Sequence, residues 1–214
     1  GVCAQIVPWN YPLLMAMWKR APALAAGNTV VFKPAEITPL TTIEFFGLIE
    51  DVGFPKGVAN LVLGAGATVG AAMSAHPGVD KIAFTGGTVT GKKILESSVG
   101  NLKRVSLELG GKSPNIVFAD ADFETAVDYA LFAIFAGQGQ ICAAGSRLLL
   151  EKSIAPKFID RLVERAKKIV VGPGLAEGTE MGPLVSEHQM EKVLHYIDLG
   201  IKEGATLACG GHRM

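Results

Sequence analysis

The segment TVVFKPAE, residues 29–36, decides the fold class of this 214-residue chain. Its apolar run VVF does not alternate with polar residues, and neither does LVL at residues 61–63. Uninterrupted runs of this kind are typical of parallel strands that are covered on both faces. The segment therefore predicts an α/β fold built on a parallel sheet.

Short strands and helices alternate along residues 1–110. The pattern predicts strands at 2–7, 29–33, 60–63, 81–84 and 103–108, and helices at 13–26, 39–52, 67–75 and 89–99. Strand–helix–strand units of this length imply right-handed crossovers and a doubly wound, Rossmann-like sheet. Helix 13–26 is apolar almost all round, which predicts that it is buried, and Pro22 is expected to kink or break it.

The pattern changes near Gly110, and we predict a domain boundary there. Residues 1–110 form one domain in this interpretation, and residues 111–214 begin a second α/β domain. The second part is expected to hold a strand after the turn in LGGKSPNIVF, helices at 122–136, 155–170 and about 187–203, and a strand at 146–150. Expected helix caps are Thr38, Ser153 and a Ser186/Gln189 capping box. Both ends of the chain read as cut, so we interpret it as an internal piece of a longer protein.

The composition excludes several classes of partner. Acidic and basic residues balance at 20 each, and 49% of the residues are hydrophobic, which favours a folded domain over a nucleic-acid or membrane-surface binder. Cys3, Cys142 and Cys209 are widely spaced and the four histidines form no ligand pair, so neither a disulfide framework nor a metal site is expected. Three unpaired thiols favour a reducing, cytoplasmic location. No apolar run reaches the length of about 18 residues that a membrane helix needs.

Two glycine-rich loops follow predicted strands and precede predicted helices. They are LGAGATVG at residues 63–70 and FTGGT at residues 84–88. Free backbone N–H groups and the helix dipole favour phosphate at such positions. Gly66 and Gly70 do not form the GxGxxG fingerprint, and a tight turn is the commoner meaning of either loop alone. Two such loops at the carboxyl edge of one parallel sheet favour a dinucleotide site.

Polar side chains also follow the strands. Lys33 and Glu36 could hold a ribose, although a solvated pair is an equal alternative, and Glu36 would repel an added 2′-phosphate. Asn10, between the two prolines of PWNYP, could face an oxyanion, although a turn or cap role is commoner. Glu108 could be a general base or the partner of Lys112 in an ordinary ion pair.

The segment QGQICAAGSR, residues 138–147, contains a single cysteine. Cys142 could be an inert core thiol, a metal ligand or a nucleophile, and its neighbours alone leave the three open. A metal ligand is disfavoured because no partner ligands accompany it. A nucleophile is favoured by the presence of Asn10 and Glu108 at strand ends beside a plausible dinucleotide site.

Five segments together resemble the aldehyde dehydrogenase superfamily of the NAD(P)-dependent, hydrolytic type. They are PWNYP, FKPAE, FTGGT, LELGGKSP and GQICAAGSR, and the looser GPGLAEGTEMGPLVS extends the similarity nearly to the end. The resemblance covers essentially the whole chain, which would be less than half of a complete family member.

The resemblance implies a catalytic role for four residues. Cys142 would attack the aldehyde to give a thiohemiacetal, and hydride transfer would leave a thioester. The Asn10 side chain and the Cys142 backbone N–H would form the oxyanion hole. Glu108 would activate the water that hydrolyses the thioester, and Lys19 would orient Asn10 or Glu108.

The resemblance also implies NAD as cofactor, with NADP less favoured. The residues expected around NAD are Ile6, Pro8, Trp9, Lys33, Glu36, Gly66, Gly70, Phe84, Gly86, Gly87, Thr88 and Leu109. The residues expected to line an aldehyde tunnel are Tyr11, Met15, Trp18, Ile141 and Ala143. Gly87 stands where the family often has serine, so a phosphate contact there must come from backbone or water. The family's later glutamate–phenylalanine segment, which holds the nicotinamide ribose, is absent from these residues.

Two other functions compete with NAD-dependent oxidation of an aldehyde to a carboxylic acid. One is a CoA-acylating semialdehyde dehydrogenase, against which Glu108 argues. The other is a non-catalytic structural homologue, against which the presence of both Cys142 and Glu108 argues. The expected partner is a small aldehyde, and the full-length protein is expected to be a homodimer or homotetramer. The chain alone is expected to be inactive and not to fold stably.

Overall fold

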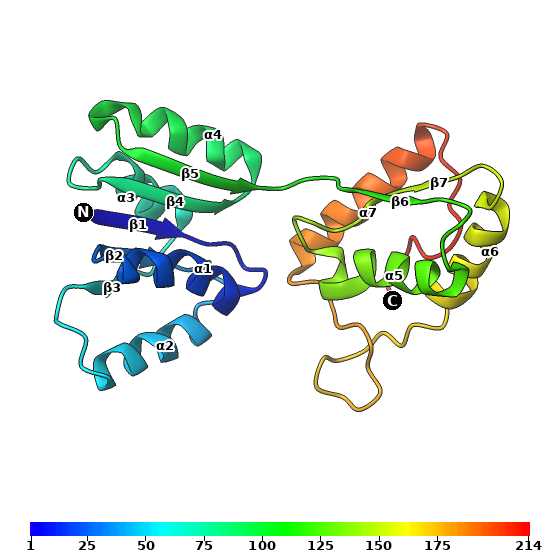
Figure 1. Cartoon of the computed structure of the whole chain (residues 1–214), viewed down its shortest axis with the longest axis horizontal. Helices are drawn as coiled ribbons and strands as arrows, with labels where there is room; N and C mark the ends of the chain where they lie inside the picture. Colours follow the sequence, from blue (N-terminus) through cyan, green and yellow to red (C-terminus); the bar gives the residue numbers. More distant parts are fainter. The chain divides into compact units, whose positions relative to one another are not determined.

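The computed structural model describes residues 1–214, the whole chain. It divides into two compact units, Gly1–Gly110 and Gly111–Met214 (Figure 1). The first unit is a five-stranded sheet between helices, and the second contains a two-stranded sheet with three longer helices.

The sheet of the first unit is entirely parallel. Its strands are β1 (Val2–Ile6), β2 (Thr29–Lys33), β3 (Ala59–Leu61), β4 (Lys81–Gly86) and β5 (Arg104–Leu109), in the order β3-β2-β1-β4-β5. All five strands point the same way, so their carboxyl ends lie at one edge (Figure 1). This confirms the predicted α/β class with a doubly wound parallel sheet.

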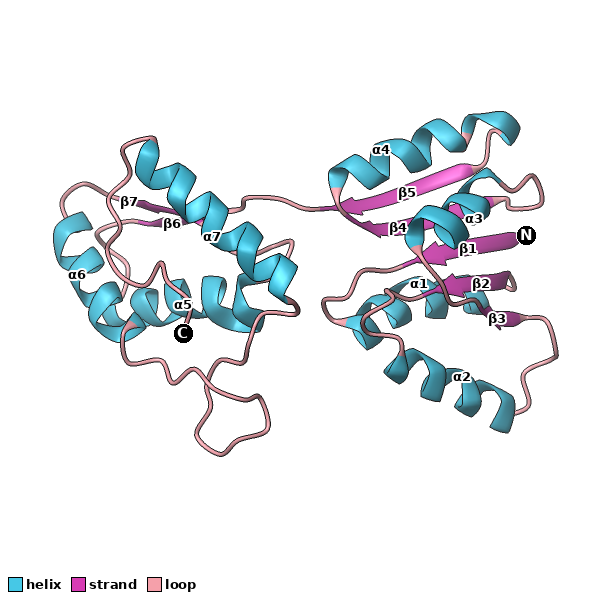
Figure 2. Cartoon of the chain, turned by 180° about the vertical axis from the view of Figure 1, so that it is seen from behind, coloured by secondary structure: helices cyan, strands magenta, loops and turns pink.

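Helices cover both faces of this sheet (Figure 2). On one face, α1 (Pro12–Ala25) and α2 (Leu40–Asp51) pack against Val30 and Phe32 of β2. On the other face, α3 (Ala71–Ala75) and α4 (Thr88–Ser97) pack against Ile82 and Phe84 of β4. These four apolar strand residues are at most 4% exposed. Val31, between Val30 and Phe32, packs against the cluster on the opposite face, which explains why the run VVF contains no polar residue.

The helix α1 differs from the sequence prediction. It continues through Pro22 to Ala25, so the proline does not break it. It buries only Met15, Ala16 and Arg20, whereas Trp18 remains 66% exposed. The prediction of a fully buried helix is therefore wrong for this chain, because only a narrow stripe of α1 contacts the sheet and α2.

Arg20 occupies an aromatic enclosure instead of an ion pair. Its guanidinium carbon lies 4.4 Å from the ring centres of Phe32 and Phe46 and 4.6 Å from that of Phe45. None of its three guanidinium nitrogens has a hydrogen-bond partner in the chain, and burial lowers its pKa to about 10. Each cation–π contact contributes about 0.5–2 kcal/mol, which offsets part of the cost of burying the charge.

The second unit has its own apolar core. Its strands β6 (Pro114–Val117) and β7 (Arg147–Leu150) are parallel, and its helices are α5 (Phe123–Phe135), α6 (Ala155–Ala166) and α7 (Glu187–Lys202). Val127 and Phe158, both fully buried, join α5 and α6 within this core.

Helix caps confirm one of the three expected positions. Ser186 Oγ accepts a hydrogen bond from the Gln189 backbone N–H at 3.2 Å and caps α7. Ser153 does not cap α6, because its hydroxyl bonds the Glu151 carboxylate instead. Thr38 does not cap α2 either: the helix begins after Pro39, and the buried Thr38 hydroxyl has no partner in the chain.

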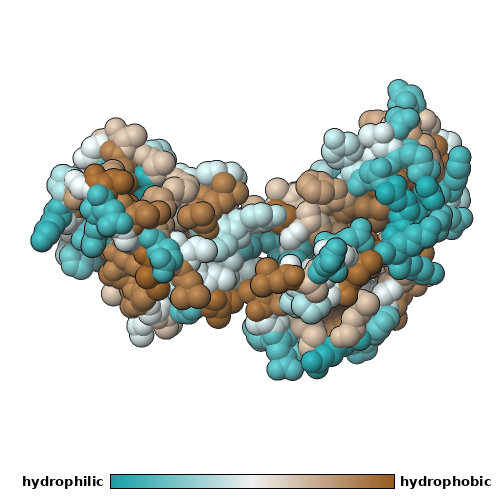
Figure 3. All heavy atoms as spheres, turned by 90° about the horizontal axis from the view of Figure 1, so that it is seen from below, coloured by the Kyte–Doolittle hydropathy of each residue, from teal (hydrophilic) through white to brown (hydrophobic).

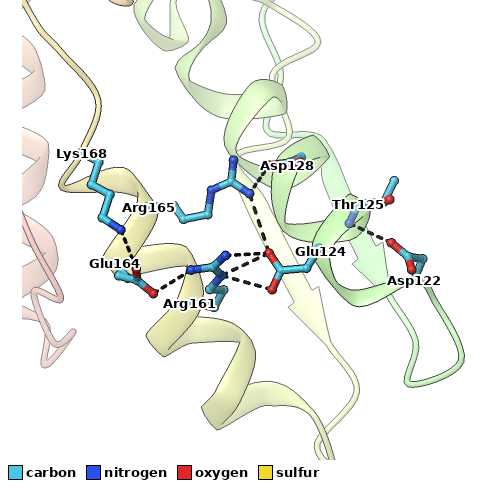
Figure 4. A network of polar contacts seen from close by, with 8 residues as sticks. All are labelled: Asp122, Glu124, Thr125, Asp128, Arg161, Glu164, Arg165 and Lys168. Carbon is cyan, nitrogen blue, oxygen red and sulfur yellow. Dashed lines mark hydrogen bonds and ion pairs between the residues drawn. The ribbon is translucent and has the colours of Figure 1, made fainter.

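A network of charged side chains joins α5 and α6 on the surface of the second unit (Figure 4). Arg161 binds Glu124 of α5 at 2.9 Å and Glu164 of its own helix at 2.8 Å. Arg165 contacts Glu124 and Asp128. The network ties the exposed sides of the two helices together above their shared apolar core.

Apolar side chains also reach the surface of the chain (Figure 3). Trp18 and Leu40 of the first unit and Tyr196 of the second are more than 60% exposed. No helix has both the length and the apolar character needed to cross a bilayer.

Candidate active site

The strand order places a switch point between β1 and β4. The chain builds β1, β2 and β3 toward one edge and then returns to add β4 and β5 on the other side of β1. In doubly wound sheets, ligands bind in the crevice outside the carboxyl ends of strands at such a point. The segments that follow β1 and β4 here are residues 7–11, with Asn10, and the pair Gly87–Thr88.

Lys33, Glu36 and Gly66 form a connected group next to this edge. Lys33 ends β2, is only 2% exposed, and its ammonium lies 3.4 Å from Glu36 Oε1. The same carboxylate oxygen accepts a short hydrogen bond from the Gly66 backbone N–H. The Glu36 side chain is 49% exposed, so solvent and a ligand can reach its carboxylate.

These contacts keep Glu36 ionised. Burial opposes the charge, but hydrogen bonds from its own backbone N–H and from that of Gly66 outweigh it, and Lys33 adds a favourable charge. The pKa of Glu36 therefore lies below its ordinary value. A carboxylate fixed in this way accepts hydrogen bonds and repels a nearby phosphate.

Several predicted cofactor residues are buried in the apolar core just below the carboxyl edge of the sheet. Ile6 and Phe84 are 8% and 4% exposed and belong to the apolar cluster under α3 and α4. A Cβ on Gly70 would lie 3.6 Å from Ile6, an ordinary contact distance, so packing alone does not require glycine there. A Cβ on Gly86 would lie 2.4 Å from the Phe84 ring. The Ile6 and Phe84 side chains are enclosed by packing, and their assignment to the cofactor site stays a prediction.

Gly87 and Thr88 present an open helix start. Gly87 is the N-cap residue of α4, no side chain caps the helix, and no atom lies within 4 Å of the place where a Cβ would be. Thr88 is exposed at the first helical position. Backbone N–H groups at the start of a helix are favourable partners for an anionic phosphate. Leu109, which ends β5 nearby, is half-buried against Gly91 of α4.

The segment after β1 is held in a defined bend. The Val7 N–H donates to the Lys33 carbonyl at 3.2 Å, and Pro8, Trp9 and Asn10 are half-buried. Tyr11 has φ 50°, in the left-handed region, and Pro12 then begins α1. A left-handed tyrosine is uncommon, and such backbone positions cluster at functional sites.

Lys19 and Glu108 lie close enough to interact electrostatically. Burial lowers the pKa of Lys19, the Glu108 carboxylate opposes that effect, and Lys81 lowers the pKa further. Glu108 is exposed near the end of β5, paired in register with Thr85 of β4. The predicted relation between Lys19 and Glu108 thus has a geometric basis within the first unit.

Cys142 lies in an exposed turn of the second unit. The turn follows three left-handed residues, Gly137, Gln138 and Gly139, and is closed by a hydrogen bond from the Ala144 N–H to the Ile141 carbonyl. The backbone N–H of Cys142 donates to no other backbone group, so it is available to an oxyanion.

Close packing around Gly145 explains why this position holds a glycine. A Cβ there would lie 3.1 Å from Ala133 of α5 and 3.2 Å from the Asn115 Cβ of β6. Its N–H also donates to the Ala133 carbonyl at 2.9 Å. The glycine therefore lets the turn that bears Cys142 lie directly on α5.

The predicted tunnel residues separate into exposed and buried groups. Tyr11 and Trp18 are exposed, Ala143 is exposed and Ile141 is half-buried. Met15 is only 9% exposed and packs in the core beneath α1, and its assignment to the tunnel stays a prediction. Its neighbour Leu14 is 42% exposed, compared with 43% for Tyr11 and 66% for Trp18. The apolar periodicity of α1 gave no signal that separated Leu14 from Met15.

The predicted catalytic residues are distributed over both units. Asn10, Lys19 and Glu108 belong to the first and Cys142 to the second. No group of three or more His, Cys, Asp or Glu side chains is arranged to hold a metal ion.

Comparisons with known proteins decide the family. The sequence profile of the "Aldehyde dehydrogenase family" matches residues 1–214. The chain belongs to the aldehyde dehydrogenase family. It is 61% identical over 213 residues to betaine aldehyde dehydrogenase of Bacillus subtilis (strain 168), covering 100% of this chain and 44% of that protein. It is 58% identical over 212 residues to aldehyde dehydrogenase 1A1 of Bos taurus, covering 99% of this chain and 42% of that protein.

Solved structures of the family share this fold. A crystal structure of betaine aldehyde dehydrogenase from Staphylococcus aureus in complex with NAD⁺ matches with a TM-score of 0.99 and 55% identity, covering 100% of this chain and 42% of that one. A double mutant of the same enzyme, solved with NAD⁺ and a BME-modified cysteine, matches with a TM-score of 0.98. The chain thus spans less than half the length of these relatives.

Proposed function

We propose that the protein containing this chain oxidises an aldehyde to a carboxylic acid with NAD⁺. The observation that carries the proposal is the close similarity, over all 214 residues, to an aldehyde dehydrogenase solved with NAD⁺. The open helix start at Gly87 and the ionised Glu36 support it from within the chain. Residues 1–110 would be part of the dinucleotide-binding domain, and residues 111–214 the first part of the catalytic domain.

Cys142 is the nucleophile in this proposal. Its sulfur forms a bond to the carbonyl carbon, and the carbonyl oxygen becomes an oxyanion. The Asn10 amide and the Cys142 backbone N–H donate to that oxygen. Bound NAD⁺ supplies the hydride acceptor. Loss of hydride from the carbon leaves an acyl group on the sulfur as a thioester.

Glu108 completes the reaction. Its carboxylate takes a proton from a water molecule as the water oxygen attacks the thioester carbon. The carbon–sulfur bond then breaks, releasing the acid and restoring the Cys142 thiolate. Lys19, which interacts with Glu108 in the first unit, holds that carboxylate near its working position.

NAD⁺ is preferred over NADP⁺ because of Glu36. Its exposed carboxylate can accept from the ribose hydroxyls, while its charge disfavours a 2′-phosphate. The remaining assignments, namely a cytoplasmic location and a homodimeric or homotetrameric full-length protein, stay part of the proposal. The three free cysteines fit a reducing compartment.

Betaine aldehyde is the substrate that we propose to test first. The chain is 61% identical to a betaine aldehyde dehydrogenase. Tyr11 and Trp18 stand seven residues apart, nearly two helical turns, and both are exposed. Exposed aromatic faces attract quaternary ammonium groups through cation–π interactions, each worth about 0.5–2 kcal/mol.

The test uses the complete protein. Betaine aldehyde, an uncharged aliphatic aldehyde of similar size and retinal are each offered with NAD⁺, and NADH absorbance is followed. We expect NADH and a free carboxylic acid, with kcat/KM highest for betaine aldehyde. A parallel reaction with CoA present separates the competing function, because an acyl-CoA product would identify a CoA-acylating enzyme. Absence of NADH with every aldehyde would contradict the proposal.

A further inference from the structure

One face of the first unit's sheet carries a row of polar side chains along β4 and β5. Lys81 of β4 pairs in register with Arg104 of β5, and Ala83 pairs with Ser106 two residues further on. Residues two apart on a strand share a face, so Lys81, Ser106 and Glu108 lie on the same side of the sheet. This is the side on which α1 packs, because Cys3 of β1 pairs with both Lys81 and Val30.

One hydrogen bond holds Lys81 within this row, and a second holds α1 beside it. Lys81 Nζ donates to Ser106 Oγ at 2.6 Å, which holds the ammonium between β4 and β5. Gln5, only 1% exposed, donates from Nε2 to the Lys19 carbonyl at 2.7 Å and anchors that turn of α1 to β1. The backbone of Lys19 is therefore attached to the sheet beside the row that ends in Glu108.

The Lys19 ammonium interacts with charges at both ends of the row. Glu108 attracts it and Lys81 repels it. Lys81 is the first residue of β4, and Glu108 lies one residue before the end of β5. Repulsion by Lys81 and attraction by Glu108 therefore both move the Lys19 ammonium toward the carboxyl ends of the strands. We propose that Lys81, held by Ser106, is a positioning residue that directs the Lys19 ammonium toward Glu108. The inference rests on the proposed function of Glu108 in thioester hydrolysis.

The arrangement has a consequence for pH dependence. The charges that act on Lys19 are Glu108 of β5 and Lys81 of β4. The register also places Arg104 of β5 on this side of the sheet, and the titratable group of β1 on this side is the Cys3 thiol. Arg20, next on α1, is turned into its aromatic enclosure. Burial lowers the pKa of Lys19, Glu108 opposes it and Lys81 lowers it further. Removing the Lys81 charge therefore raises the pH at which Lys19 becomes neutral.

The experiment compares Lys81→Met and Lys81→Arg in the complete enzyme. Steady-state kcat and KM are measured from neutral to alkaline pH, together with the pre-steady-state NADH burst and the thermal midpoint. In Lys81→Met we expect a lower kcat at neutral pH with little change in KM. We expect the alkaline limb of the kcat profile to move to higher pH, while the burst is retained. Lys81→Arg keeps the charge and should restore the wild-type limb.

Ser106→Ala is the second variant, which keeps the charge but releases it from its anchor. It should move the alkaline limb in the same direction as Lys81→Met, by less, and it replaces Lys81→Met if that variant fails to fold. A limb that stays at its wild-type position in a folded variant would overturn the inference. The proposed function fails separately, because in that case the wild-type enzyme itself makes no NADH from any aldehyde.

Discussion

At the scale of single residues, Glu36 is the best-defined element of the candidate cofactor site. Its Oε1 contacts both the Gly66 N–H and the Lys33 ammonium, and the side chain is half exposed. Its low pKa means that it carries full charge at neutral pH and loses it only when the pH falls below its ordinary range. Cofactor preference should therefore not change between pH 6 and 8 through this group.

Glu36→Gln tests this role directly. The amide keeps the size of the side chain but removes the charge that repels a 2′-phosphate. We expect kcat/KM with NADP⁺ to rise relative to NAD⁺ by about tenfold, or about 1.4 kcal/mol. Glu50→Gln, in the exposed last turn of α2, is the matched control and should leave the ratio unchanged. An unchanged ratio in Glu36→Gln would exclude Glu36 from the ribose site.

Gly145 gives a second prediction at this scale. Gly145→Ala places a Cβ against Ala133 and Asn115, so the turn that bears Cys142 must shift or α5 must give way. We expect the free energy of unfolding to fall by about 1–3 kcal/mol, with a larger loss of kcat than of substrate affinity. Gly47→Ala is the control, since that position lies inside α2 with no atom within 4 Å of the added group. It should stabilise the protein by about 0.5–1 kcal/mol, as measured by urea unfolding.

At the scale of elements, the charged network between α5 and α6 in Figure 4 makes the free energy of unfolding vary with pH in the acidic range. Hydrogen bonds from Lys168 and Arg161 lower the pKa of Glu164 from 4.5 to about 2. A depressed pKa contributes stability above the unfolded value, and this contribution disappears as the pH falls through the folded value. The window of loss is therefore pH 4.5 to 2.

Arg161→Met removes the centre of that network. The wild-type thermal midpoint should fall through the window from pH 4.5 to 2 more steeply than that of the variant. High salt should reduce the difference, because these side chains are exposed and screened. Parallel curves for the two proteins would show that the network does not contribute. Lys202→Met, which removes a simple pair with Asp198 on α7, is the control.

The sequence predicted elements better than it predicted which side chains are buried. The runs VVF in β2 and LVL at the end of β3 contain no polar residue, and this pattern correctly indicated parallel strands covered on both faces. Met15 and Leu14 are both apolar on α1, and the packing of α1 on β2 decides which of them is buried. Thr38 does not cap α2 because the helix begins at Leu40, one residue later than predicted, so that Pro39 is the N-cap residue. The expected helix at 67–75 begins instead as a π-helical turn, η1 (Gly66–Gly70), before α3.

The candidate site shows the same division. Strand ends and glycines indicated Glu36, Gly87 and Glu108, because those positions follow from topology. Nothing in the sequence indicated that the Phe84 ring packs against Gly86, because this contact depends on the rotamer of Phe84 in the core. Lys81 and Ser106 were missed because their relation exists only across the register of two strands.

At the scale of the whole molecule, the proposed mechanism requires residues from both units to act on one thioester. Asn10, Lys19 and Glu108 belong to Gly1–Gly110, and Cys142 belongs to Gly111–Met214. The relatives are more than twice as long as this chain, so the complete protein is the proper object of the test.

The most direct measurement is the mass of the peptide that contains Cys142. In the complete protein carrying Glu108→Gln, hydride transfer should proceed and hydrolysis should stall, so the acyl group stays on sulfur. After one turnover with aldehyde and NAD⁺, acid quenching and trypsin release residues 113–147, in which Cys142 is the single cysteine. We expect this peptide to gain the mass of the acyl group in proportion to the NADH formed. NADH formation with an unmodified peptide, or with the acyl group on another cysteine, would contradict the account.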